Sequence, residues 1–200
     1  DGEVVWREGD QPAEYSSPML CTLAGVPQII SFNMLFITAH DPEKGTVLWE
    51  YPWGIRQPVV AQPLPVGPDR IVFTSGYGVG AELLEIKRDA AGKLSPERVW
   101  KSMNMKSTTG RVILGLMPAT AGTISGRIGS LRHRDGFIYG LDDGILACIQ
   151  VEDAKRKWKG GRYGHGQFLF VGDLILLTAE NGELVLLAPA YSRETAAEPP

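Results

Sequence analysis

Histidine, cysteine and paired carboxylates are the residue types best suited to chemistry, and this 200-residue chain has few of them. It holds three histidines and two cysteines. His165 is the strongest single candidate, because the glycines on either side of it in YGHGQ allow a ligand or another backbone segment to approach closely. Its imidazole could titrate near neutral pH. No acid or nucleophile adjoins it in the sequence, which favours a structural hydrogen bond over catalysis.

The other reactive residues form no recognised catalytic or metal-binding motif. Cys21 and Cys148 lie far apart and form no CxxC pair, so we expect two free thiols buried on strands. Asp142 and Asp143 lack the spaced oxygen ligands of a calcium loop, and a hairpin turn explains them better. The sequence contains no GxSxG, HExxH or phosphate-binding loop. It therefore predicts no catalytic residue and no metal site.

The composition is that of an ordinary globular protein and argues against two classes of partner. The chain is 44% hydrophobic and 22% charged. A formal net charge of -3 and a pI near 5.7 argue against nucleic-acid binding, which requires a basic surface. No apolar run reaches the roughly 18 residues that a membrane-spanning helix needs. The two remaining possibilities are a protein partner or a small ligand.

A repeat built around tryptophan positions these residues. The stretch DPEKGTVLW reads as a polar turn, a glycine and an apolar run that ends at Trp49. Similar endings occur at Trp6, Trp100 and Trp158, at successive intervals of 43, 51 and 58 residues. Trp53 falls outside the pattern. A near-period of this size indicates a repeat architecture.

Each repeat contains short β-rich runs separated by Gly, Asp, Asn or Pro, which is the signal of antiparallel strands. No segment keeps the apolar spacing of a helix. We therefore predict an all-β fold, a β-propeller of four-stranded antiparallel blades with a tryptophan on each outermost strand. A glycine four residues before the tryptophan suits a left-handed turn. The predicted blades span residues 9–53, 54–103, 104–161 and 162–190.

Residues 3–8 are predicted to form a lone outer strand, while the last repeat has only three strands. The lone strand could complete the last repeat and close a ring of four blades. We favour the alternative, in which the chain begins inside a blade and is about half of a ring of seven or eight blades. Residues 107–131 break the pattern, either as a loop insertion or as an atypical stretch of the fold. Residues 191–200 are predicted to be disordered.

In a propeller, the loops that lead into the innermost strands form one mouth of the central channel. Polar residues recur in these loops, seven to ten residues after the repeat tryptophans. They would converge as a ligand-binding site does, although any channel mouth is polar because it is wet. Both interpretations stay open. The candidate ligand-binding residues are Ser16, Ser17, Arg56, Gln57, His165 and Gln167.

The repeat resembles the pyrroloquinoline-quinone-like (PQQ-like) β-propeller family, in particular the C-terminal portion of its BamB-like branch. The resemblance implies a propeller that acts as a binding or scaffold module, in an exported protein of the bacterial periplasm or cell envelope. It covers most of the chain outside 103–132 and the tail. The positions that carry it are Asp41, Gly45 and Trp49, Gly2 and Trp6, and Asp153 and Trp158.

The same family also includes quinoprotein dehydrogenases, so a PQQ-dependent oxidoreductase fragment is the alternative. The dehydrogenase branch is known for a disulfide between adjacent cysteines beneath the quinone, a calcium site and a catalytic aspartate. This chain has no adjacent cysteines. The resemblance therefore implies the propeller and not the quinone, and PQQ and calcium are expected only under the alternative.

Overall fold

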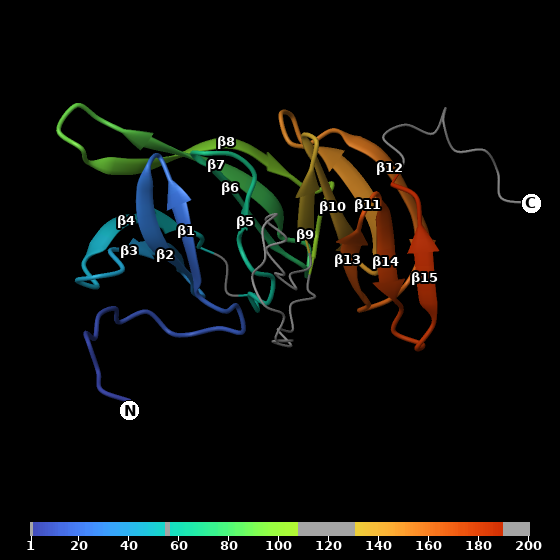
Figure 1. Cartoon of the computed structure of the whole chain (residues 1–200), viewed down its shortest axis with the longest axis horizontal. Helices are drawn as coiled ribbons and strands as arrows, with labels where there is room; N and C mark the ends of the chain where they lie inside the picture. Colours follow the sequence, from blue (N-terminus) through green and yellow to red (C-terminus); the bar gives the residue numbers. More distant parts are fainter. Residues whose placement is uncertain (1, 55–56, 108–130, 190–200) are drawn as a thin grey trace, which may run out of the picture.

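The computed structural model describes residues 2–54, 57–107 and 131–189, which form fifteen strands in four antiparallel sheets. The sheets are arranged as the four blades of a β-propeller, which confirms the predicted fold class. No helix occurs in this part of the chain. The first blade and the fourth lie at opposite ends of the arrangement in Figure 1.

The strands follow the predicted repeats closely. The first blade consists of β1 (Met19–Leu23), β2 (Val26–Phe32), β3 (Phe36–His40) and β4 (Val47–Pro52). The second consists of β5 (Leu64–Pro65), β6 (Arg70–Ser75), β7 (Gly80–Arg88) and β8 (Leu94–Ser102). The third consists of β9 (Leu131–Arg134), β10 (Phe137–Asp142), β11 (Ile145–Gln150) and β12 (Arg156–Arg162). The fourth has three strands, β13 (Gln167–Val171), β14 (Leu174–Thr178) and β15 (Leu184–Leu187).

Within each blade the strands pair in chain order, from an inner strand to an outer one. The inner strands β1, β5, β9 and β13 follow one another from left to right in Figure 1. The repeat tryptophans lie where the sequence predicts, with Trp49 on β4, Trp100 on β8 and Trp158 on β12. Short turns join neighbouring strands within each blade.

The turn before each outer strand depends on a left-handed residue. Gly45 has φ = 75°, as expected for a glycine in this turn. Ala154 takes the equivalent place in the third blade with φ = 56°, a conformation that is costly for a residue with a Cβ atom. Asp143 and Gly144 both have positive φ, which confirms the predicted hairpin, whereas in the Asn181–Gly182 turn only Gly182 does.

The core consists of three clusters, each of which joins two consecutive blades. We call the face of a blade that points toward the next blade its forward face, and the opposite face its rear face. In the first contact, Ile30 and Trp49 on the forward face of the first blade pack with Phe73 and Leu84 on the rear face of the second. The other two clusters join the second blade to the third and the third to the fourth. Each blade is therefore stabilised by its neighbours.

The prediction of a strand at residues 3–8 is wrong for this structure, which assigns no strand there. Instead, Trp6 lies on the turn between β3 and β4, where its Nε1–H donates to the Pro42 carbonyl at 3.0 Å. Its ring packs on Gly45 and stacks on His40. A strand forms only where another strand accepts its backbone hydrogen bonds. This segment is held by its tryptophan instead.

Three other expectations stay untested. The atypical stretch predicted at residues 107–131 falls almost entirely on residues 108–130, which lie outside the described residues. The predicted disordered tail at residues 191–200 also lies outside them. The number of blades in a complete ring also remains a prediction.

Replacing Trp49 with alanine should destabilise the protein by about 3–5 kcal/mol, because a large core side chain would be lost. Trp49 is 4% exposed, and its Nε1–H donates to Gln28 Oε1 at 2.6 Å. Chemical denaturation of the full chain measures the change. Val99→Ala, a 40% exposed position on β8, serves as the control and should cost less than about 1 kcal/mol. An equally small loss for Trp49→Ala would contradict the blade packing.

Candidate ligand-binding site

The loops that lead into the inner strands of the first two blades lie side by side. The Tyr15 N–H donates to the Val59 carbonyl at 3.1 Å, and Ser16 Oγ donates to the Ala61 carbonyl at 3.1 Å. Val59 and Ala61 are buried beneath this contact, whereas Tyr15 is 72% exposed. These bonds fix the two loops as one continuous surface. Ser17 follows as a half-buried residue of the same loop.

The corresponding loop of the fourth blade carries His165. Its backbone N–H donates to Glu180 Oε2 at 3.1 Å, and the Glu180 N–H donates to the Tyr163 carbonyl at 2.9 Å. Gly164, with φ = 63°, packs so closely on Glu180 that a side chain there would collide with the carboxylate. The glycines that flank His165 therefore do permit a close approach, but the group that approaches is Glu180 of the same chain. The His165 side chain and Gln167 at the start of β13 are exposed.

The structure brings together only part of the predicted channel-mouth set. Ser16 and Ser17 lie on the loop that contacts the loop of the second blade, in which Gln57 is exposed. His165 and Gln167 lie two blades further along. Arg56 and the loop of the third blade, residues 108–130, fall outside the described residues. The convergence of the two groups on one ligand therefore stays a prediction.

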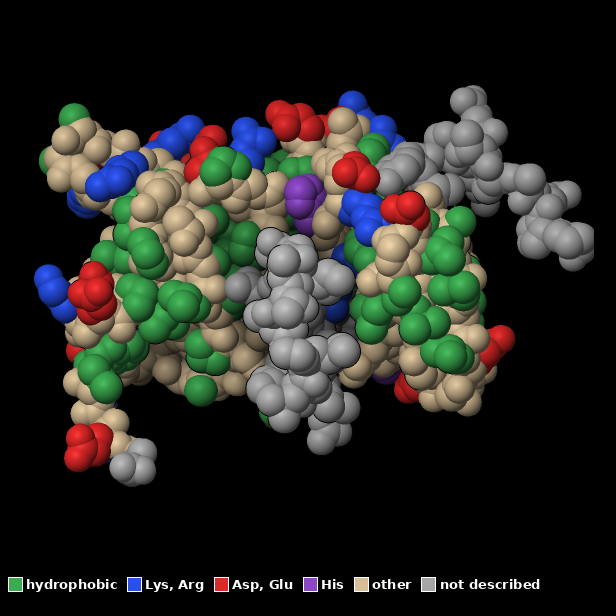
Figure 2. All heavy atoms as spheres, viewed as in Figure 1, with side chains coloured by type: hydrophobic (Ala, Val, Ile, Leu, Met, Phe, Trp, Pro, Cys, Tyr) green, Lys and Arg blue, Asp and Glu red, His purple; other side chains and the backbone are tan. Residues whose placement is uncertain are grey.

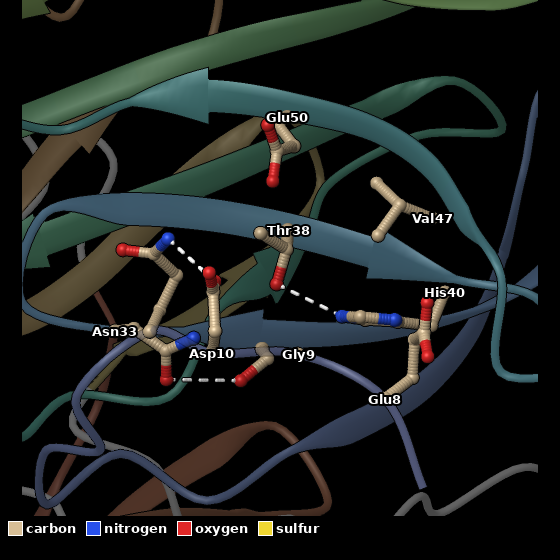
Figure 3. Close-up of a pocket in the computed structure, with 10 residues that line it drawn as sticks. Glu8, Gly9, Asp10, Asn33, Thr38, His40, Val47 and Glu50 are labelled. Carbon is tan, nitrogen blue, oxygen red and sulfur yellow. Dashed lines mark hydrogen bonds between the residues drawn. The ribbon is translucent and has the colours of Figure 1, made fainter. Parts of the chain in front are cut away.

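Sequence reasoning missed a hollow of about 530 Å³ on the rear face of the first blade (Figure 3). The segment at residues 8–11 forms one wall, and β2, β3 and β4 with the turn after β2 form the other. No local sequence pattern indicates this hollow, because the segment at residues 8–11 packs over residues that lie twenty or more positions later in the chain. The lining residues are Glu8, Gly9, Asp10, Gln11, Ser31, Asn33, Thr38, His40, Val47 and Glu50.

His40 is the histidine of this hollow, and both of its ring nitrogens are engaged. Nδ1 lies 2.8 Å from the Gly45 carbonyl oxygen, which can only accept, so Nδ1 carries the hydrogen. Nε2 lies 3.1 Å from Thr38 Oγ1 (Figure 3), within hydrogen-bonding distance of the hydroxyl. The ring is also stacked on Trp6. His40 thus fixes the turn and the segment above it, as expected for a structural histidine.

The charge of the hollow is one-sided. Glu8, Asp10 and Glu50 contribute carboxylates, while neither Lys nor Arg lines it. Such a surface favours a cationic or hydroxyl-rich group over an anion. The described residues hold no group of three or more His, Cys, Asp or Glu side chains arranged to bind a metal ion. The rear faces of the second, third and fourth blades are each covered by the preceding blade.

Two buried acidic side chains join elements within or between blades. Glu82 on β7 accepts a hydrogen bond from Tyr51 Oη of the first blade at 2.7 Å and forms ion pairs with Arg98 and Lys101. Desolvation by burial, together with the bond to Glu82, raises the pKa of Tyr51 to about 12. This network ties the first blade to the second.

Asp142, at the end of β10, is the second buried acid, and its partners surround it. It accepts the backbone N–H of Lys106 at 2.9 Å and forms ion pairs with the side chains of Lys106, Arg156 and Lys159. A buried carboxylate with several cationic partners holds its loops in place. Asp142 therefore anchors this cluster, while Asp143 forms the turn and also pairs with Lys106 at 3.3 Å.

The two cysteines are free, as predicted, and differ in environment. Cys148 on β11 is completely buried, and that burial raises the pKa of its thiol to about 11. Cys21 on β1 is half-buried. They belong to the third and first blades, so neither can form the adjacent-cysteine disulfide of the dehydrogenase branch.

Comparison with known proteins supports the fold alone. No protein-family model matches the chain, and no curated protein does. The computationally designed Ika4 protein matches with a TM-score of 0.61 at 12% identity, covering 95% of this chain and 99% of that one. The designed Ika8 protein matches with a TM-score of 0.56 at 12% identity, and the match covers 91% of this chain and 48% of that one. These similarities agree with the β-propeller class.

BamB from Moraxella catarrhalis is a more distant structural match. The TM-score is 0.42 at 14% identity, and the match covers 80% of this chain and 58% of BamB. The chain thus spans about half the length of Ika8 and somewhat more of BamB. The class of the protein is that of β-propellers, and similarity at this level assigns no function.

Alkylation should distinguish the two thiols. We expect iodoacetamide at pH 8 to modify Cys21 at least tenfold faster than Cys148, because the thiolate is the reactive form and Cys148 is both buried and high in pKa. Peptide mass spectrometry over a time course measures both rates in one sample. Unfolding the protein in urea should make the two rates similar. Equal rates in the folded protein would contradict the placement of Cys148 in the core.

Proposed function

We propose that this chain is a non-catalytic β-propeller binding module that takes a protein segment or a small ligand at the channel mouth. The hydrogen bonds from Tyr15 and Ser16 to the loop of the second blade carry the proposal. They order two neighbouring loops into one surface without using the exposed side chains of Tyr15 and Gln57. A binding surface with ordered backbone and exposed polar and aromatic groups loses little entropy when a ligand binds.

The placement of the ionisable groups supports binding rather than catalysis. Glu82 and Asp142 are buried among their cationic partners, and His40 fixes a turn. Burial of Cys148 keeps it protonated near neutral pH. These side chains stabilise the fold, whereas the side chains exposed on the inner-strand loops are accessible to a ligand.

The oxidoreductase alternative has less support in the chain itself. The cysteines lie on different blades, and the described residues provide no cluster suited to calcium. The location in the periplasm or cell envelope, and the bacterial origin, rest on the sequence resemblance alone and stay part of this proposal. No helix among the described residues is long and apolar enough to cross a membrane.

Selection of peptides from a random phage-displayed library against the full chain would test the binding surface. We expect the selected peptides to lose at least tenfold in affinity for the variants Tyr15→Ala and His165→Ala, since truncation of a contact residue typically has this effect. Lys93→Ala, in the β7–β8 turn at the opposite edge of the blades, is the matched control and should bind normally. Selected peptides that bind both loop variants as tightly as the unchanged chain would refute the channel-mouth proposal.

A cofactor titration separates the two functions. Incubation of the full chain with pyrroloquinoline quinone and Ca²⁺, followed by desalting, should leave no quinone absorbance with the protein. Stoichiometric retention together with dye-linked alcohol oxidation would overturn the proposal of a non-catalytic module and establish the alternative.

A further inference from the structure

In each of the first three blades, a row of paired residues crosses the sheet on the forward face and ends at a tryptophan. The pairing is continuous from the inner strand to the outer one. The fourth blade carries the same row as far as Leu186 on β15, where it stops. The rows are Met19–Ile30–Ala39–Trp49, Leu64–Val72–Leu83–Trp100, Arg132–Tyr139–Cys148–Trp158 and Leu169–Leu176–Leu186.

The fourth blade also exposes its forward face, which is apolar. Its rear face packs on the third blade through residues such as Phe168 and Leu177. Figure 2 shows hydrophobic side chains gathered over this end of the molecule. The five exposed side chains of the forward face are each between 37 and 66% exposed, and such an apolar patch is unusual on a free surface. The exposed residues are Leu169, Val171, Leu174, Leu184 and Leu186.

At the other end of the chain, Trp6 already occupies the place of an outer-strand tryptophan from a preceding blade. Trp100 donates its Nε1–H to the Val151 carbonyl of the next blade at 2.7 Å, and Trp6 donates to the Pro42 carbonyl of the first blade at 3.0 Å. Val151 and Pro42 are equivalent, since each lies seven residues before the tryptophan of its own blade. Within the described residues, Trp6 thus takes the position of an outer-strand tryptophan without the other strands of its blade, and the sheet β13-β14-β15 lacks an outer strand.

We propose that a second copy of this chain supplies the missing strand, so that its residues 3–8 pair with the β15 edge and its Trp6 lies beside Leu186. Among the described residues, β15 pairs with β14 alone, which leaves the other edge open to strand addition. The chain's own residues 3–8 lie at the opposite end of the molecule (Figure 1), so the strand comes from the partner.

Trp6 can make this contact without leaving its present position. Trp100 shows how, because it completes the row of its own blade while its indole also binds the next blade. Trp6 would likewise stay on the first blade of its own chain and complete the fourth blade of the partner. The exchange is reciprocal, so two copies joined head to tail form a closed ring of eight blades.

The rear face of the first blade is the surface that the partner's leucines would cover. This face includes the exposed Leu20 and the hollow beneath residues 8–11. Polar groups on it do not prevent such a contact, because the contact between the first and second blades already encloses Gln28 and Glu82. The hollow is thus the space that a preceding blade occupies elsewhere in the fold.

Light scattering after size-exclusion chromatography of the full chain over a range of concentrations tests the proposal. We expect a dimer of twice the 21.8 kDa chain mass. Trp6→Ala and Leu186→Glu should each raise the dissociation constant at least tenfold. Tyr77, which is 61% exposed in the β6–β7 turn, provides the matched controls Tyr77→Ala and Tyr77→Glu, and both should leave the dimer unchanged.

Mixing the two variants distinguishes strand exchange from misfolding and from a symmetric contact between leucine faces. In a head-to-tail pair of Trp6→Ala with Leu186→Glu, one of the two contacts keeps the native Trp6 and Leu186. Trp6 and Leu186 would touch in such a contact, so changing both costs less than the sum of the two single losses. The mixture should therefore dimerise more strongly than either variant alone. A monomer, an assembly larger than two copies, a dimer insensitive to Trp6→Ala, or a mixture no better than its components would each overturn the proposal.

Discussion

Burial of sheet faces between neighbouring blades is the interaction on which this structure depends. A single antiparallel sheet with two apolar faces is unstable in water, because both faces would be exposed to solvent. Each of the three core clusters buries two such faces between consecutive blades. Stability in such a chain is approximately a sum over blades and their contacts, as in other repeat proteins. The repeat tryptophans lie on the outer strands, where their large side chains add to these contacts.

Gln28 and Glu82, two polar side chains inside the contact between the first and second blades, are tolerated because they are paired. Gln28 accepts the indole hydrogen of Trp49, and Glu82 accepts the Tyr51 hydroxyl while its charge faces Arg98 and Lys101. An unpaired amide or carboxylate at such a site would be strongly destabilising. The Tyr51–Glu82 pair joins the first blade to the second, so it also helps to define the register in which these two blades meet.

The sequence was sufficient for the fold because turn chemistry and tryptophan position repeat along the chain. Gly45 and the run ending at Trp49 gave both the hairpin and the outer strand. The strand predicted at residues 3–8 does not form in this structure, because strand formation depends on a neighbouring strand that a local pattern does not contain. The hollow was missed for a similar reason, since the 8–11 segment and Glu50 meet only in the folded chain. For the channel mouth, sequence placed Ser16 and His165 in equivalent loops but gave no distance between them.

The stacking of Trp6 on His40 has a consequence for the rate and cost of association. An unanchored N-terminal segment would sample many conformations, and a partner that ordered it would bear that entropy at the moment of binding. Here the indole hydrogen bond to Pro42 and the bonds of His40 to Gly45 and Thr38 order the segment as the first blade folds. The entropy is therefore lost during folding of the single chain, and any later partner encounters a rigid edge rather than a flexible arm.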